Sequence, residues 1–148
     1  MAKHLKMMGF YFWILGLFTV GRWALSLSGA EYAKTTNVFS LVTLALIASA
    51  HHAAFARAFR GYTLKDAAAL GAAIGVVTQL VIFASTLISY LFGMSTFWNH
   101  PTALNSPEAV PFGAAMVARV GGLIGNTIFT VIAACIGYVM GASLKAAK

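Results

Sequence analysis

Acidic residues are scarce in this sequence. Its 148 residues include only three Asp and Glu, and charged residues of both signs make up 9% of the chain. Soluble domains contain about 25% charged residues, so this chain has too few charges to form a surface that faces water. Three acids spread along the chain also provide no carboxylate pair on one helix face for acid–base catalysis.

Cysteine and proline are also rare. Cys135 is the only cysteine, which excludes an intrachain disulfide and a cysteine-based metal cluster, and we expect it to be a small buried apolar side chain. The three prolines (Pro101, Pro107 and Pro111) fall in one segment. The apolar runs therefore contain no proline, and nothing indicates the broken helices that form the binding sites of larger transporters.

Sequence motifs of enzymes are missing as well. The chain has no HExxH, no GxSxG and no glycine-rich phosphate loop ending in Lys-Ser or Lys-Thr. We therefore expect a non-enzymatic protein without a metal site. The net charge of +7 comes from short Lys and Arg clusters between apolar runs, which favours contacts with anionic lipid headgroups over nucleic acid as a partner.

Long apolar runs are what the sequence does contain, and hydrophobic residues make up 60% of it. Four runs, at about 7–27, 37–56, 67–92 and 112–144, reach the roughly 20 residues that cross a bilayer. The sequence predicts a single transmembrane domain: an all-α integral membrane protein with four transmembrane helices packed as an antiparallel bundle. Arg22 and Trp23 interrupt the approach to a possible signal-peptidase site at 28–30, so we expect the first helix to be retained.

The distribution of Lys and Arg outside the runs predicts the orientation. With both termini on one side, that side holds Lys3, Lys6, Arg57, Arg60, Lys65, Lys145 and Lys148, and the other side holds only Lys34. Positive residues gather on the cytoplasmic side. We therefore expect cytoplasmic termini, an outer loop at 93–111, and a multi-pass location in a cell membrane, that of a bacterial inner membrane.

Several residues mark helix ends and helix contacts. Asn37 and Thr63 are expected to cap the starts of the second and third helices, and Gly61 is expected to stop the second. Small residues four positions apart let membrane helices approach closely. Three such pairs occur in the third and fourth runs: Gly71 with Gly75, Gly121 with Gly125, and Gly137 with Gly141.

Two arginines lie within apolar runs and form the first candidate site. In the predicted topology Arg22 and Arg119 both fall in the outward half, and Glu31 and Glu108 border the same side. One interpretation is structural: each arginine pairs with a glutamate or reaches outer headgroups and ties helices together. The other is an anion or lipid-phosphate site between the first and fourth helices, which a water-filled cavity shared by both arginines would favour.

His51 and His52 form a second candidate site. Histidine is a common axial ligand of haem iron, and membrane subunits hold haem, pigment or quinone between helices. Adjacent residues on a helix point about 100° apart, so these two cannot ligate one metal together, and one chain offers a single axial ligand. The alternative is that they lie at the inner interface beside Arg57 and bond a headgroup or a helix carbonyl.

Gln79 and Asn126 are expected near mid-membrane, where a mutual hydrogen bond would join the third and fourth helices. A polar substrate contact is the alternative role for this pair. Three functional hypotheses remain. The first is a non-enzymatic protein that self-associates or is an accessory subunit of a membrane complex, without a cofactor. The others are a haem-, pigment- or quinone-binding redox subunit and an anion or amphiphile transporter.

Overall fold

The computed structural model describes residues 2–145, and it leaves undescribed the side chains of residues 2, 3, 5 and 145. Lys3, Lys145 and Lys148, on which the predicted orientation partly depends, therefore lie outside the described side chains. The helices in chain order are α1 Ala2–Met7, α2 Gly9–Leu27, α3 Tyr32–Thr35, α4 Leu41–Arg60, α5 Leu64–Leu91, the 3-10 helix η1 Pro101–Leu104 and α6 Phe112–Lys145.

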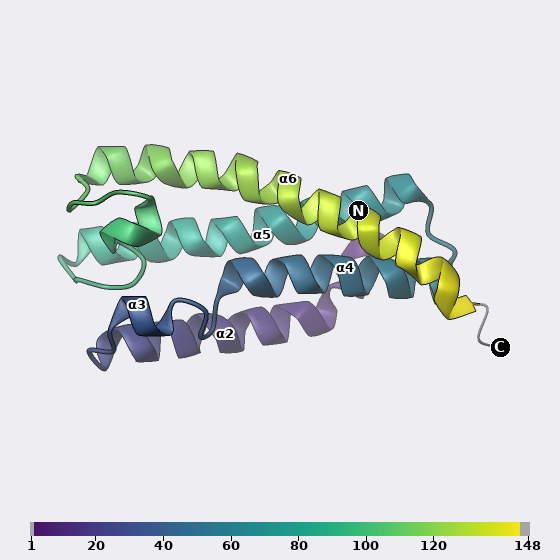
Figure 1. The fold of residues 1–148 in the computed structure, drawn as a ribbon, viewed down its shortest axis with the longest axis horizontal. Helices are drawn as coiled ribbons and strands as arrows, with labels where there is room; N and C mark the ends of the chain where they lie inside the picture. The colour runs from purple at the N-terminus through teal and green to yellow at the C-terminus, as the bar shows by residue number, and fades with distance from the viewer. Residues whose placement is uncertain (1, 146–148) are drawn as a thin grey trace.

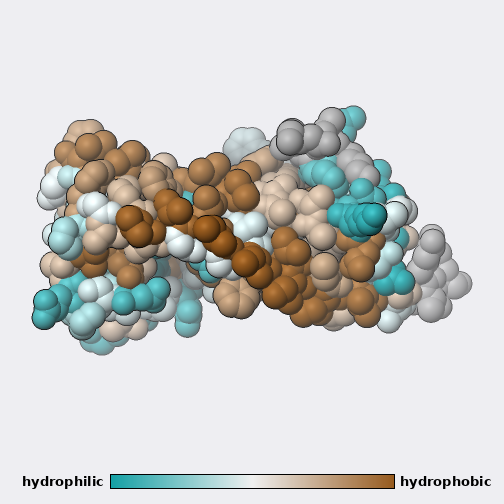
Figure 2. Space-filling model, turned by 90° about the horizontal axis from the view of Figure 1, so that it is seen from above, coloured by the Kyte–Doolittle hydropathy of each residue, from teal (hydrophilic) through white to brown (hydrophobic). Residues whose placement is uncertain are grey.

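The four long helices account for most of the chain. Helices α2, α4, α5 and α6 are each long and apolar enough to cross a membrane, and no β-strand occurs within residues 2–145. This confirms the predicted all-helical class and the four membrane-spanning candidates. Seen from one side, apolar side chains form a band along the middle of the molecule, while hydrophilic side chains gather toward its two ends (Figure 2).

The ends of α4 and the start of α5 show one wrong and two correct predictions. Asn37 does not cap this helix: α4 begins at Leu41, and the side chain of Ser40 accepts a hydrogen bond from the backbone N of Thr43 at 3.3 Å. The residues that precede α4, including Asn37, belong to α3 and to the turn that follows it. At the other end Gly61 stops α4 with a left-handed φ of 65°, and Thr63 caps α5 as predicted.

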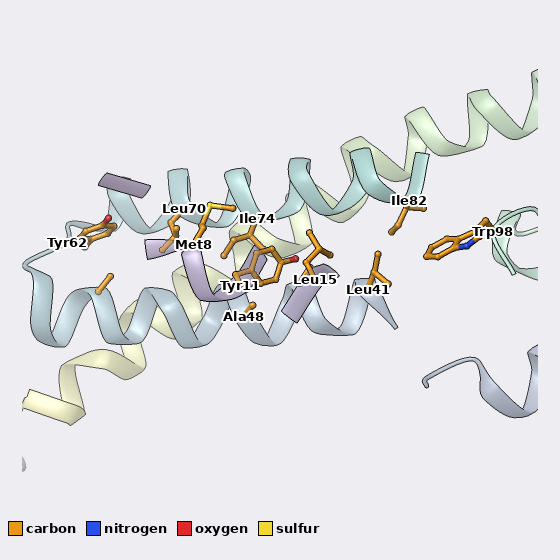
Figure 3. Close-up of a cluster of buried hydrophobic side chains, with 12 residues drawn as sticks. Met8, Tyr11, Leu15, Leu41, Ala48, Tyr62, Leu70, Ile74, Ile82 and Trp98 are labelled. Atoms are coloured by element: carbon orange, nitrogen blue, oxygen red, sulfur yellow. The ribbon is translucent and has the colours of Figure 1, made fainter. Parts of the chain in front are cut away.

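Helices α4, α5 and α6 pack against one another. Helix α6 lies along both α5 and α4, α4 also contacts α5, and α2 lies against α4 (Figure 1). A cluster of buried side chains from α2, α4 and α5 fills the interior, with Tyr11 lying between Ile74 and Ala48 (Figure 3). The Tyr11 hydroxyl is hydrogen-bonded to Thr78, so a polar bond joins α2 to α5 inside this apolar cluster.

Glycines let α6 approach both neighbours. A Cβ on Gly71 of α5 would lie 2.6 Å from the carbonyl oxygen of Thr130 and 2.7 Å from the Cβ of Ala134. A Cβ on Gly137 of α6 would collide with the carbonyl of Ala50 on α4. Two of the predicted small-residue pairs are therefore used inside the chain, whereas Gly121 and Gly125 have no atom within 4 Å of an added Cβ.

The two ends of the bundle differ in what they contain. The loop end holds α3 and the 93–111 connection, which meet where Tyr32 stacks on His100 with ring centroids 4.4 Å apart. The basic end holds the turn between α4 and α5, with Arg57, Arg60 and Lys65 around it.

The close packing of α6 on α4 predicts a cost for Gly137→Ala. The added methyl group has no room beside the Ala50 carbonyl, so we expect the free energy of unfolding to fall by about 1–3 kcal/mol, as for other overpacked sites. Denaturant titration of the purified protein in mild detergent measures this. Gly16→Ala on α2, where an added Cβ meets nothing within 4 Å, is the matched control. Equal stability of the two variants would contradict the packing argument.

Candidate functional site

Arg22 and Arg119 line one cavity of about 150 Å³ at the loop end. Arg22 comes from α2 and Arg119 from α6, two helices at opposite sides of the bundle in Figure 1. We call this space the arginine cavity, and its walls also include Tyr32, Phe97, Trp98 and Ala103. The structure therefore brings together the two arginines that the sequence singled out, with the 93–111 connection between them.

Arg22 is held by the short segment that follows it. Its Nη1 donates to the carbonyl oxygens of Thr35 at 2.8 Å and Val38 at 2.9 Å, and to that of Thr36 at 3.2 Å. Only 7% of the residue is exposed. The guanidinium carbon lies 4.7 Å from the centroid of the Phe97 ring, a cation–π distance. The charge is therefore buried among carbonyl dipoles and an aromatic ring.

Arg119 fastens the 93–111 connection to the bundle. Its Nη2 donates to the Trp98 carbonyl at 2.5 Å, its Nη1 to the Ala103 carbonyl at 3.1 Å, and its Nε to the Thr86 hydroxyl at 2.9 Å. The Thr86 hydroxyl also donates to the Trp98 carbonyl at 3.1 Å. One guanidinium thus joins α6, α5 and the connection at the wall of the cavity.

Neither arginine has a carboxylate partner among the side chains that the structure describes. Glu31 pairs with Lys34 at 2.6 Å on the exposed surface, and Glu108 is exposed. No Asp or Glu is among the residues that line the arginine cavity. The Arg–Glu pairing considered from the sequence is not what this structure contains, because both arginines bond carbonyl and hydroxyl oxygens instead.

A larger hollow of about 600 Å³ adjoins the arginine cavity at the loop end. We call it the vestibule; Glu31, Tyr90, Asn99 and His100 are among the residues that line it. Tyr32 and Phe97 line both spaces, and their rings meet edge to face with centroids 5.3 Å apart. These two rings therefore form the wall shared by the vestibule and the arginine cavity.

His51 and His52 lie elsewhere, on α4 beside α1 and α2. His52 donates from Nδ1 to the Ala48 carbonyl at 2.8 Å, one turn back on its own helix, and its ring meets Tyr11 edge to face. The two histidine rings are 5.7 Å apart at 82°. Within the described residues no three His, Cys, Asp or Glu come together in a group that could hold a metal ion.

Gln79 and Asn126 come close to each other beside Gly122. A Cβ on Gly122 would lie 3.5 Å from Oε1 of Gln79 and 3.7 Å from Nδ2 of Asn126. No hydrogen bond joins these two amides in the described part of the chain. The two side chains lie near each other as predicted, but the predicted hydrogen bond between them is absent from the described residues.

Three contributors to the site were not predicted from the sequence: Tyr32, Phe97 and Trp98. Phe97 and Trp98 belong to the predicted outer loop, and they are only 6% and 5% exposed because this connection folds back between the helices. Buried donors normally have an acceptor, and the indole Nε1 of Trp98 has none. The polar streak Ser85, Thr86 and Ser89 on α5 was the available signal, since Thr86 and Ser89 bond residues of this connection.

Comparison with known proteins gives no relative for this chain: no family model, no curated protein and no solved structure matches it significantly.

Proposed function

We propose that the chain is a non-enzymatic integral membrane protein that binds a small anion in the arginine cavity, between α2 and α6. The observation that carries the proposal is that two arginines on different helices line one cavity with no acid in its walls. A cavity shared by both arginines favours an anion site over a purely structural role for the two side chains.

Burial of the two arginine charges is energetically costly. Moving a cation out of water costs several kcal/mol even after relaxation, and a carbonyl dipole returns only part of this because it carries no net charge. Two guanidinium groups at one small cavity add their positive potentials. A bound anion would offset both charges at once, and the unpartnered Nε1–H of Trp98 offers a further donor at the cavity wall.

The size of the cavity limits the ligand. A volume of about 150 Å³ corresponds to roughly five water molecules at about 30 Å³ each. Chloride or an inorganic oxyanion such as phosphate fits this space with its remaining water, whereas a larger organic substrate does not. The anion would enter the arginine cavity from the loop end through the vestibule, past the rings of Tyr32 and Phe97 that separate the two spaces.

Anion transport is an extension of the same proposal. Beyond the arginine cavity, the core around Tyr11, Leu15 and Ile74 fills the space between α2, α4 and α5 toward the basic end (Figure 3). Entry from the loop end has to pass only the wall of Tyr32 and Phe97, whereas release at the basic end would need the helices to move apart. The transporter hypothesis thus includes the binding site and adds this motion.

Anion binding predicts stabilisation that depends on both arginines. A ligand at 100 times its Kd stabilises the folded state by about 2.7 kcal/mol. We expect phosphate or chloride, tested separately at constant ionic strength, to raise the melting temperature of the purified protein. We expect Arg22→Lys and Arg119→Lys to bind more weakly, because lysine lacks the forked donors, and the double replacement by Gln to lose the effect.

The control for that experiment is Arg57→Gln. Arg57 lies at the basic end, where its Nη1 donates to the Tyr138 carbonyl at 2.8 Å, far from the arginine cavity in the chain's fold. General salt effects on protein surfaces should be the same in this variant and in the wild type. The proposal is wrong if the cavity variants retain the full anion-dependent rise in melting temperature.

We further propose the predicted topology: an antiparallel bundle with the basic end and both termini in the cytoplasm of a bacterium and the loop end outside. It is supported by Arg57, Arg60 and Lys65 at one end, against Lys34 at the other. In a Cys135→Ala background, an impermeant maleimide added to intact cells should label Glu108→Cys, and Lys65→Cys only after permeabilisation. Both positions are exposed, so the opposite labelling pattern would reverse the topology.

Self-association is the second candidate function. Gly71, Gly75, Gly137 and Gly141 are used for packing inside the chain, which leaves Gly121 and Gly125 with open space for a second copy or another membrane subunit.

Replacing Gly121 and Gly125 by Leu tests this association. We expect at least a tenfold weaker dimer by sedimentation in mild detergent, because leucine keeps the helices apart. Gly16→Leu, at an equally open position on α2, is the control. A wild type that sediments as a monomer at all concentrations would rule the association out.

Binding of haem, pigment or quinone at His51 or His52 stays a prediction. Its support is that the Nδ1–H of His52 is fixed by the Ala48 carbonyl, which leaves Nε2 as the nitrogen that can accept or ligate.

A further inference from the structure

A second hollow lies toward the basic end, between α1, α2 and α4. It is a groove of about 470 Å³, walled by apolar side chains that include Phe10, Ile14, Leu44, Ile47 and Phe55. Phe10, Ile47 and Phe55 are 70%, 64% and 40% exposed, so the groove opens sideways toward the lipid. His51 and His52 lie along it.

The cations of the groove lie at one end. Lys6 and Arg60 line it, and the same two residues line an adjoining hollow of about 330 Å³ together with Met7 and Tyr62. Neither hollow has an Asp or Glu in its walls. An apolar slot thus leads to a pair of exposed positive charges that no acid of the lining offsets.

The length of the slot matches one lipid leaflet. Leu44 and Phe55 are eleven residues apart on α4, which is about 16 Å of helix at 1.5 Å per residue. Half of a bilayer core of about 30 Å is about 15 Å, the depth that one acyl chain occupies. Arg60 lies a further five residues on, about 8 Å, which is where the headgroup of the same lipid begins.

We propose that this groove binds one anionic phospholipid, with an acyl chain along Leu44–Phe55 and the phosphate between Lys6 and Arg60. The phosphate of the headgroup would neutralise the positive charges of Lys6 and Arg60. The acyl chain would cover the apolar wall of the groove, which otherwise faces mobile lipid. The assignment does not depend on the arginine cavity, which lies in the other half of the bundle and shares no lining residue with the groove.

The experiment uses the full chain in mild detergent, titrated with phosphatidylglycerol and followed by native mass spectrometry, which reports bound lipid and copy number together. Each Lys or Arg near an anionic lipid contributes about 1 kcal/mol. We therefore expect Lys6→Gln with Arg60→Gln to weaken phosphatidylglycerol binding about 30-fold. Both residues are exposed, so this variant is expected to fold normally.

Three comparisons make the test decisive. Lys34→Gln with Lys65→Gln removes the same charge from exposed positions outside the groove and should leave binding unchanged. Phosphatidylcholine, which has the chains without the net charge, should bind at least tenfold more weakly than phosphatidylglycerol. Glycerol phosphate, which has the charge without the chains, should not bind at the same concentrations.

The proposal is wrong if the wild type and the Lys6→Gln, Arg60→Gln variant bind phosphatidylglycerol equally well. It is also wrong if phosphatidylcholine binds as tightly as phosphatidylglycerol, or if glycerol phosphate binds by itself. A dimer mass in place of the lipid-bound monomer would overturn it as well. The last result would mean that a second copy of the chain covers the groove.

Discussion

The guanidinium of Arg119 fixes the arrangement of the whole loop end. A connection without regular structure can lie at membrane depth only if its backbone groups find partners in the protein. Arg119 provides them for the carbonyls of Trp98 and Ala103, and Thr86 adds a second bond to the first of these. The folded-back connection then supplies Phe97 and Trp98 as walls, so the arginine cavity depends on Arg119 together with the bonds that Ser26, Thr86 and Ser89 make to the same connection.

The basic end is held together by a different kind of contact. There α6 lies against α4 and α5 with almost no side chain between the backbones, because Gly71, Gly137 and Gly141 leave room for the approach. Lipid is as apolar as the helix surface, so close packing and not burial of apolar area drives such association. Helix α2, by contrast, packs through large side chains such as Tyr11 and Leu15. The bundle is therefore tight on the α6 side and looser on the α2 side.

The sequence was sufficient to predict the four long helices and to single out Arg22 and Arg119, which line one cavity, since apolar length and a charge inside an apolar run are local signals. It was insufficient for the cavity. Residue spacing does not show whether a connection rich in proline lies on the surface or folds inward. Its position depends on long-range hydrogen bonds, such as that from Arg119 to the Trp98 carbonyl. The N-cap at Ser40 in place of Asn37 was missed for the same reason: α3 and the turn after it are stabilised by bonds to Arg22.

Helix α2 contributes to both the arginine cavity and the apolar groove, with Arg22 at the first and Phe10 at the second, twelve residues or about 18 Å apart along one helix. A tilt of this helix would change the widths of both spaces. Ligands that bind better in one tilt than in the other would then be coupled, and by thermodynamic necessity each would change the other's affinity by the same factor. Helix α2, the least tightly packed helix of the bundle, is thus the element that could couple the arginine cavity to the groove.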